Sequence, residues 1–170
     1  MKTNLILIGM PGAGKSTIGV VLAKTLGKVY VDTDLLIQQA QQRLLQQIIQ
    51  EDGVEALLAA EEQVVLQLQA QHAVVATGGS MVYSPMAMAH LKTLGLVIYL
   101  QLPLTELERR ITNMASRGIA MGPGQQLSDL YRERVPLYEK YADLTVDCSG
   151  LSLEAAVTRI TDWVTKQPIS

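Results

Sequence analysis

The stretch that decides the fold is Gly9-Met10-Pro11-Gly12-Ala13-Gly14-Lys15-Ser16-Thr17, directly after the apolar run Leu5–Ile8. Its G-x-x-x-x-G-K-[ST] spacing is that of a phosphate-binding loop between a strand and a helix. Glycines let the loop curl so that successive N–H groups point inward, and the helix start adds the positive end of its dipole. We expect Lys15 to reach the outer phosphates and the Ser16 hydroxyl to hold Mg²⁺. The pattern predicts a nucleoside triphosphate site; the alternative is an ordinary glycine turn before a helix.

Length and composition narrow the class of protein. The 170 residues fit one domain, residues 1–170, with a core that needs no disulfide or structural metal. The 14 basic and 16 acidic side chains give a net charge of −2 and form no basic stripe, which argues against a nucleic-acid partner. The one cysteine, Cys148, excludes an internal disulfide. Apolar runs are too short to span a membrane, so we expect a soluble, cytoplasmic protein without membrane contact.

Five short apolar runs alternate with helical patterns along the chain. This alternation is typical of successive βα units and predicts a three-layer α/β fold with a five-stranded parallel sheet flanked by helices. We expect a last helix that begins at Ser152, a good N-cap residue, and ends at Pro168. The expected strands are Leu5–Ile8, Val29–Val31, Ala73–Ala76, Leu96–Leu100 and Leu144–Val146.

Two segments depart from this alternation. Residues 34–71 form a glutamine-rich helical insertion, for which apolar residues at helical spacing predict two helices joined near Gly53. In residues 116–126, three glycines and a proline exclude a regular helix and indicate a lid that carries Arg117. A lid beside phosphate chemistry serves to exclude water.

Polar residues follow the second and third expected strands. Asp32 and Asp34 are two residues apart, so on an extended chain both point toward the sheet edge where α/β proteins bind ligands. Phosphoryl transfer needs one carboxylate for Mg²⁺, which suits Asp32, and another beside the acceptor hydroxyl, which suits Asp34. The alternative for Asp34 is that it N-caps the next helix. The turn Thr77-Gly78-Gly79-Ser80 follows the third strand, and its glycines let a substrate approach the backbone closely.

Taken together, these motifs resemble the shikimate kinases, small P-loop enzymes related to the nucleoside monophosphate kinases. Five motifs stand in family order over nearly the whole chain. They are the phosphate loop, Asp32-Thr33-Asp34, Ala76-Thr77-Gly78-Gly79, Leu107-x-x-Arg110 with Arg117, and Arg134-x-Pro136-Leu137-Tyr138. The resemblance implies transfer of the ATP γ-phosphate to the 3-hydroxyl of shikimate, a step toward chorismate and the aromatic amino acids. It also favours a monomer.

The resemblance implies a role for each matching residue. Lys15 and Arg117 would stabilise the transferring phosphate, and Asp34 would hold the acceptor hydroxyls. Ser16 and Asp32 would serve Mg²⁺. Gly78 and Gly79 would line the acceptor pocket, and Arg134 would pair with the acceptor carboxylate. The nucleotide-binding set would be Gly9, Gly12, Ala13, Gly14, Lys15, Ser16, Thr17, Arg117 and Arg110, the last lying along the adenine.

Departures from the family pattern concentrate on the acceptor side. Where the family usually has Gly-Glu-x-x-Phe-Arg-x-x-Glu, this chain has Gly53-Val54-Glu55-Ala56-Leu57-Leu58-Ala59-Ala60-Glu61. Leu58 therefore stands where an arginine normally grips the shikimate carboxylate, a charge-assisted contact worth about 1.5–3 kcal/mol. Ser80 replaces a third glycine, and Gly118 replaces the proline after the lid arginine. Arg43 lies elsewhere in the insertion.

Three hypotheses follow for the function. The first is a shikimate kinase with an altered acceptor site. The second is a kinase of the same fold that phosphorylates another small hydroxylated compound, less anionic near Leu58. The third is a nucleotide-binding regulatory protein without catalysis, against which the presence of both Asp34 and Arg117 argues.

Overall fold

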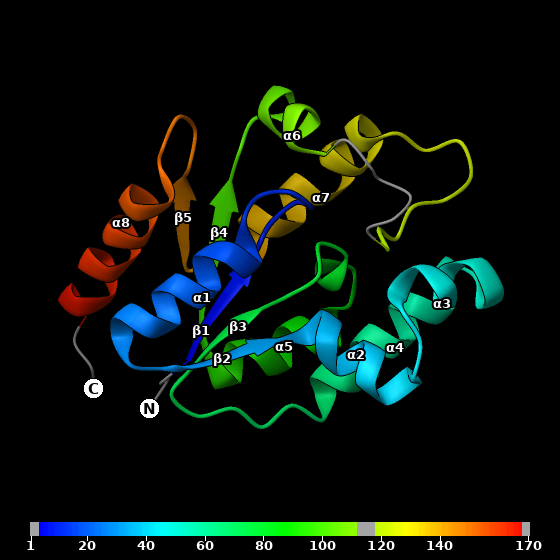
Figure 1. Ribbon diagram of the computed structural model, residues 1–170, viewed down its shortest axis with the longest axis horizontal. Coiled ribbons are helices and arrows are strands. Elements are labelled where there is room, and N and C mark those ends of the chain that lie inside the picture. The colour runs from blue at the N-terminus through cyan, green and yellow to red at the C-terminus, as the bar shows by residue number, and fades with distance from the viewer. Residues whose placement is uncertain (1–3, 112–117, 168–170) are drawn as a thin grey trace.

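The computed structural model describes residues 4–111 and 118–167. A five-stranded, wholly parallel sheet with strand order β2-β3-β1-β4-β5 forms the centre of the molecule (Figure 1). Each predicted strand is present, with every end within one residue of the expected position. The strands are β1 (Asn4–Ile8), β2 (Val29–Asp32), β3 (Ala73–Ala76), β4 (Gly95–Gln101) and β5 (Leu144–Asp147).

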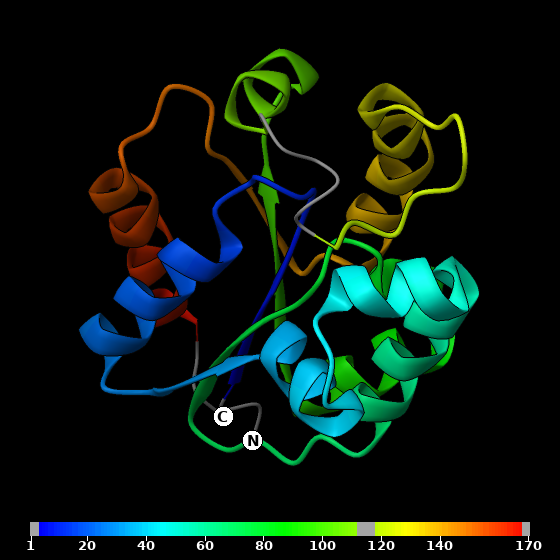
Figure 2. The ribbon, with the colours of Figure 1, turned by 45° about the vertical axis from the view of Figure 1, so that its right-hand side comes forward.

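Helices cover both faces of the sheet. Figures 1 and 2 show α1 and α8 together on one face and α5 and α7 on the other. The helices are α1 (Lys15–Leu26), α2 (Thr33–Gln41), α3 (Leu45–Asp52), α4 (Val54–Leu66), α5 (Pro85–Leu94), α6 (Leu104–Arg110), α7 (Leu127–Tyr141) and α8 (Leu153–Lys166), with a 3₁₀ turn η1 (Met81–Tyr83). Ser152 caps α8 as expected, since its hydroxyl accepts from the Ala155 N–H. Within the described ranges, no helix has the length and apolarity needed to traverse a bilayer.

Strand β1 is the centre of the core. It pairs with β3 on one edge and β4 on the other, so Leu5 lies opposite both Val74 and Leu96. Every residue of β1 is buried, which explains the apolar run Leu5–Ile8, because a central parallel strand contacts helices on both faces. The β1 carboxyl end, where the strand order reverses, is the expected ligand edge of such a sheet.

The insertion differs from the sequence-based expectation. It contains three helices instead of two, because the first expected helix ends at Gln41 and resumes at Leu45. Gln42 adopts a left-handed conformation with φ 53°, which ends α2. The break turns α3 so that Leu45 and Ile48 enter a separate hydrophobic cluster. The buried residues of this cluster are Ile37, Leu45, Ile48, Leu57, Ala60 and, from the segment before α7, Ala120.

Asn4 connects segments that are distant in the sequence. Its side-chain amide donates to the carbonyls of Ala70 and Leu94, at 2.7 and 3.0 Å, and its oxygen accepts from the Ala73 N–H at 2.9 Å. Asn4 is 1% exposed and its bond to the Ala73 N–H is buried, so this N–H loses its partner if the Asn4 amide is removed. A buried polar group that loses its partner costs about 1–3 kcal/mol.

We therefore expect Asn4→Ala to lower the free energy of unfolding by roughly 2–4 kcal/mol, measured by urea denaturation. The matched control is Gln69→Ala, which removes an exposed amide close by and is expected to change stability by less than about 0.5 kcal/mol. Equal stability of the two variants would contradict the anchoring role of Asn4.

Candidate active site

The phosphate loop wraps around the Lys15 ammonium. Gly9, Gly12 and Gly14 have φ of 150°, 82° and 94°, values that side chains rarely tolerate. The Lys15 Nζ donates to the carbonyls of Gly9 and Met10 at 2.7 and 2.8 Å. Burial lowers the pKa of Lys15 to about 8, although Asp34 opposes that shift, so the group remains largely charged at neutral pH.

The start of α1 is left open for an anion. Its N-cap, Gly14, offers no side-chain cap, and the first turn contains no acidic residue. The first N–H groups of the helix therefore combine with its dipole to favour a negatively charged ligand. Ser16 and Thr17 lie in this first turn, and Ala13 lies in the loop before it.

Asp32 closes the opposite side of this turn. Its Oδ2 accepts from the Ser16 hydroxyl at 3.2 Å and from the Tyr30 hydroxyl at 3.1 Å, while its Oδ1 accepts from the Asp34 N–H at 2.9 Å. Asp32 is therefore the N-cap of α2, and the alternative that Asp34 caps this helix is wrong. The extended-strand argument for Asp34 also fails, because the strand ends at Asp32 and Asp34 lies in the first turn of α2.

Asp34 points into a cleft of about 510 Å³. Its Oδ1 is buried and has no hydrogen-bond partner within the described part of the chain. Burial raises the pKa of Asp34 to about 6; Asp32 adds to the shift and Lys15 opposes it. A buried carboxylate oxygen without a partner is costly, so it is suited to accept a hydrogen bond from a ligand.

The Gly78-Gly79 turn brings the backbone close to the side chains of this cleft. A Cβ on Gly78 would lie 3.0 Å from an oxygen of Asp34 and 3.0 Å from an oxygen of Glu61, and a Cβ on Gly79 would lie 3.0 Å from the Arg134 guanidinium. The Tyr138 hydroxyl donates to the Gly79 carbonyl at 2.6 Å. A Cβ on Gly79 would also lie 2.8 Å from the Pro11 ring, so a side chain at either position requires its neighbours to shift.

Arg134 is the positive group at the inner end of the cleft. It is 1% exposed, and it donates to the Tyr83 hydroxyl at 3.1 Å and to the Ala120 carbonyl at 2.6 Å. The guanidinium also stacks over the Tyr83 ring, 5.1 Å from its centroid. Among the described residues it makes no ion pair within 4 Å, so a buried positive charge remains available for an anionic ligand.

Glu61 and Ser80 belong to the same site, although sequence reasoning assigned them no role. The Glu61 carboxyl is 4% exposed and is hydrogen-bonded through both oxygens to the Ser80 hydroxyl. Burial raises the pKa of Glu61 to about 7; the Ser80 hydrogen bond opposes the shift and Asp34 adds to it. The available signal was a lone charge on the apolar face of α4, beside Leu57, Ala60 and Val65.

The structure shows where the residues that depart from the family pattern lie. Leu58 lies on α4 and lines a side cavity next to the cleft, where it offers no charge. Arg43 forms surface ion pairs with Glu51 and Asp52, so it does not replace an arginine at position 58. At Gly118 a Cβ would collide with Leu45, which accounts for a glycine there.

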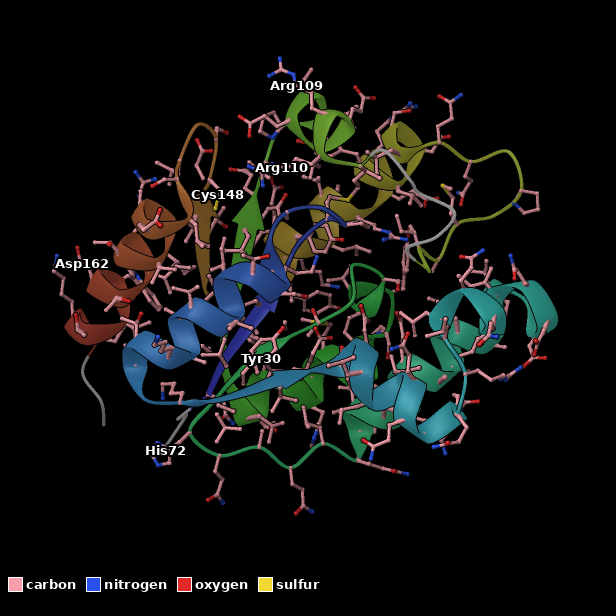
Figure 3. All side chains as sticks on the ribbon, in the orientation of Figure 1. Tyr30, His72, Arg109, Arg110, Cys148 and Asp162 are labelled. Carbon is pink, nitrogen blue, oxygen red and sulfur yellow. The ribbon has the colours of Figure 1, made fainter. Side chains whose placement is uncertain are left out.

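An outer cavity of about 250 Å³ adjoins the outer end of the cleft. It lies between the phosphate loop, the end of α6 and the start of α8. Arg110 lines both the cleft and this outer cavity, and Figure 3 shows it at the same end of the sheet as Cys148, which lines the outer cavity. Arg117, predicted to contact the phosphate, lies outside the described residues.

The sheet is parallel, and a phosphate loop follows its central strand. Together with the helical insertion and the two buried carboxyls, this arrangement defines the chain as a P-loop small-molecule kinase. The family model for shikimate kinase matches residues 11–165. The chain belongs to the shikimate kinase family, whose members are ATP-dependent phosphotransferases acting on an alcohol group.

Individual relatives agree with this assignment. The shikimate kinase of Thiobacillus denitrificans is 37% identical over 94% of this chain and 88% of its own length, and that of a Synechococcus strain is 41% identical over 87% and 77%. A solved shikimate kinase from Acinetobacter baumannii, in complex with shikimate, superposes with a TM-score of 0.90 at 27% identity, covering 99% of this chain and 96% of that one.

The raised pKa of Glu61 predicts a pH-dependent stability. In the unfolded chain the carboxyl ionises near its ordinary pKa of 4.5, whereas in the folded protein it holds its proton to about pH 7. Its contribution to stability is therefore fully present below pH 4.5 and is lost as the pH rises to about 7. We expect Glu61→Gln, relative to wild type, to gain on the order of 2–3 kcal/mol of stability across this window.

Urea denaturation at a series of pH values measures this difference. The control Glu55→Gln removes an exposed carboxyl from the same helix and is expected to follow wild type. A constant difference between Glu61→Gln and wild type over the whole window would contradict the raised pKa.

Proposed function

We propose that this protein transfers the γ-phosphoryl group of ATP to the 3-hydroxyl of shikimate. The observation that carries the proposal is the Asp34 carboxylate, which has an unpartnered buried oxygen in the cleft that also contains Lys15 and Arg134. A hydroxylated carboxylic acid has the matching groups: hydroxyls for Asp34 and a carboxylate for Arg134. The A. baumannii relative was solved with shikimate, which supports this acceptor.

The nucleotide would lie along the outer half of the cleft. Its phosphates would bind the N–H groups of residues 12–17, and Lys15 would exchange its contacts with Gly9 and Met10 for phosphate oxygens. The adenine would enter the 250 Å³ cavity beside Arg110. A planar guanidinium stacks well on a flat base, so Arg110 would hold the adenine from one side.

The residues that would hold Mg²⁺ suit this ion. The Ser16 hydroxyl and the Asp32 carboxylate are hard oxygen donors 3.2 Å apart, beside the phosphate loop. Two protein donors are the usual number where phosphates and water complete the coordination. When bound, Mg²⁺ would neutralise charge on the phosphates. The Tyr30 hydroxyl would keep the Asp32 carboxylate oriented.

The acceptor would be held between Asp34 and Arg134. Asp34, ionised above about pH 6, would accept a hydrogen bond from the reacting hydroxyl. The hydroxyl oxygen then forms a bond to the γ-phosphorus, and the bond from that phosphorus to the β–γ bridging oxygen breaks with its electron pair on ADP. The hydroxyl proton passes to Asp34. Lys15 would stabilise the charge on the transferring group, as would Arg117, whose role stays a prediction.

Leu58 carries no charge, so it is also compatible with a second class of acceptor. Arg134 is the one cation at the inner end of the described cleft, because Lys15 is held by carbonyls of the phosphate loop and Arg110 lies where the cleft meets the outer cavity. A single guanidinium binds a carboxylate less firmly than a pair. Another small hydroxylated compound, with an apolar group near Leu58, is therefore the alternative substrate. The expected monomer and cytoplasmic location also stay predictions.

Substitutions of the neighbouring residues Arg109 and Arg110 test where the adenine binds. We expect Arg110→Ala to raise the KM for ATP roughly 2- to 30-fold, the equivalent of losing about 0.5–2 kcal/mol of stacking. Arg109→Ala is the matched control: this side chain is exposed and extends outward from α6 in Figure 3, so the KM should not change. Equal effects of both substitutions on KM would contradict the placement.

The acceptor is tested by ADP release from Mg·ATP with and without shikimate. We expect strong stimulation by shikimate in wild type and a loss of at least about a hundredfold in Asp34→Asn, which removes the proton acceptor without changing shape. Asp162→Asn alters an exposed carboxylate on α8 and should retain full activity. If shikimate does not stimulate the wild type while ATP still binds, the acceptor is a different compound.

A further inference from the structure

The Ser80 hydroxyl is buried and directed at a single partner. Ser80 is 5% exposed, and its Oγ lies 2.6 and 2.7 Å from the two oxygens of Glu61. Serine just before a helical turn usually caps that turn, but no side-chain cap bond is formed at η1. The hydroxyl therefore contributes to Glu61 and not to the local backbone structure.

The Ser80–Glu61 pair forms a wall between two spaces. Both residues line the 510 Å³ cleft and also the 280 Å³ side cavity, which extends past Leu58 and Tyr83. Glu61 thus has room on either side of its present position. A Cβ on Gly78 would lie 3.0 Å from an oxygen of Glu61 and 3.0 Å from an oxygen of Asp34. These two carboxyl oxygens are therefore at most 6.0 Å apart.

Charged groups from three elements act on Glu61. Asp34 of α2 repels its negative charge, and Arg134 of α7 attracts it. On α4, the helix that contains Glu61, Glu55 and Glu62 line the side cavity. The Tyr83 hydroxyl of η1 accepts from Arg134 and donates to Glu133. Without the Ser80 hydroxyl, the repulsion from Asp34 would favour rotation of Glu61 into the side cavity.

We propose that Ser80 is a positioning residue for the acceptor: its hydroxyl holds the Glu61 carboxyl on the cleft wall between Asp34 and Arg134. This proposal rests on the proposed function, since it assumes that the acceptor occupies this end of the cleft. A fixed Glu61 offers the acceptor a second hydrogen-bonding group beside Asp34. It also limits the space next to Arg134, so the pair determines which acceptors fit.

The test compares Ser80→Ala with Ser84→Ala. Ser84 also donates to a glutamate of α4, Glu62, but both residues line the side cavity and not the cleft. We expect Ser80→Ala to raise the KM for shikimate about tenfold, with the KM for ATP changed less than about twofold. Ser84→Ala should lower the unfolding temperature, because it also removes the α5 cap, and leave both KM values unchanged.

Ser80→Thr retains the hydroxyl and should restore most of the shikimate affinity. If Ser80→Ala leaves the KM for shikimate unchanged, or raises both KM values equally, the proposal is overturned. Circular dichroism identifies any variant that fails to fold. In that event the readout is taken from Glu61→Gln, which should also raise the KM for shikimate selectively, and a selective effect on ATP would overturn the proposal.

A titration separates this proposal from the proposed function. Carbon-13 NMR of labelled glutamate carboxyls follows Glu61, with the Glu61→Gln protein used to assign its signal. Loss of a hydrogen bond to the ionised form should move the Glu61 midpoint to higher pH in Ser80→Ala. If wild type does not phosphorylate shikimate, the proposed function fails alone, and an unchanged midpoint overturns the positioning role of Ser80.

Discussion

The structure depends on holding four ionisable groups at one cleft without letting them form ion pairs with one another. Lys15, Asp34, Glu61 and Arg134 line one cleft, yet none forms an ion pair within 4 Å with another described residue. Backbone carbonyls hold Lys15, Tyr83 and Ala120 hold Arg134, and Ser80 holds Glu61. Charges that are held by neutral partners keep their capacity for a ligand, at a cost in stability.

Sequence reasoning predicted the parts of the fold that local pattern controls. The five strands contain short runs that are mostly apolar, and the phosphate loop has a residue spacing that is specific to this kind of site. The break between α2 and α3 was missed because Gln42 is a weak turn former, and the left-handed turn there is stabilised by packing of Leu45 and Ile48 instead. Long-range packing is not visible in a local pattern.

In the candidate site, too, contacts between residues that are close in the sequence could be predicted, and contacts between distant residues could not. Residues of the phosphate loop follow one another along the chain, so their meeting could be predicted. Glu61 and Ser80 are separated by 19 positions and come from different elements, and their contact is created by the docking of α4 against η1. Position 80 was noticed only as a missing glycine. The interaction of Ser80 with Glu61 became evident only in the structure, where the Ser80 hydroxyl lies next to the buried Glu61 carboxyl.

The place of β1 in the sheet has a consequence for synthesis. β1 precedes the other four strands of the sheet in the chain, so both of its neighbours, β3 and β4, are made after it. Until residues 73–76 have been made, its apolar residues have no strand to pair with, and β2 alone cannot supply one because it joins the sheet through β3. Until β3 has been made, a nascent chain of this fold therefore exposes a strand that the folded protein buries completely, and chaperones bind such segments in this period.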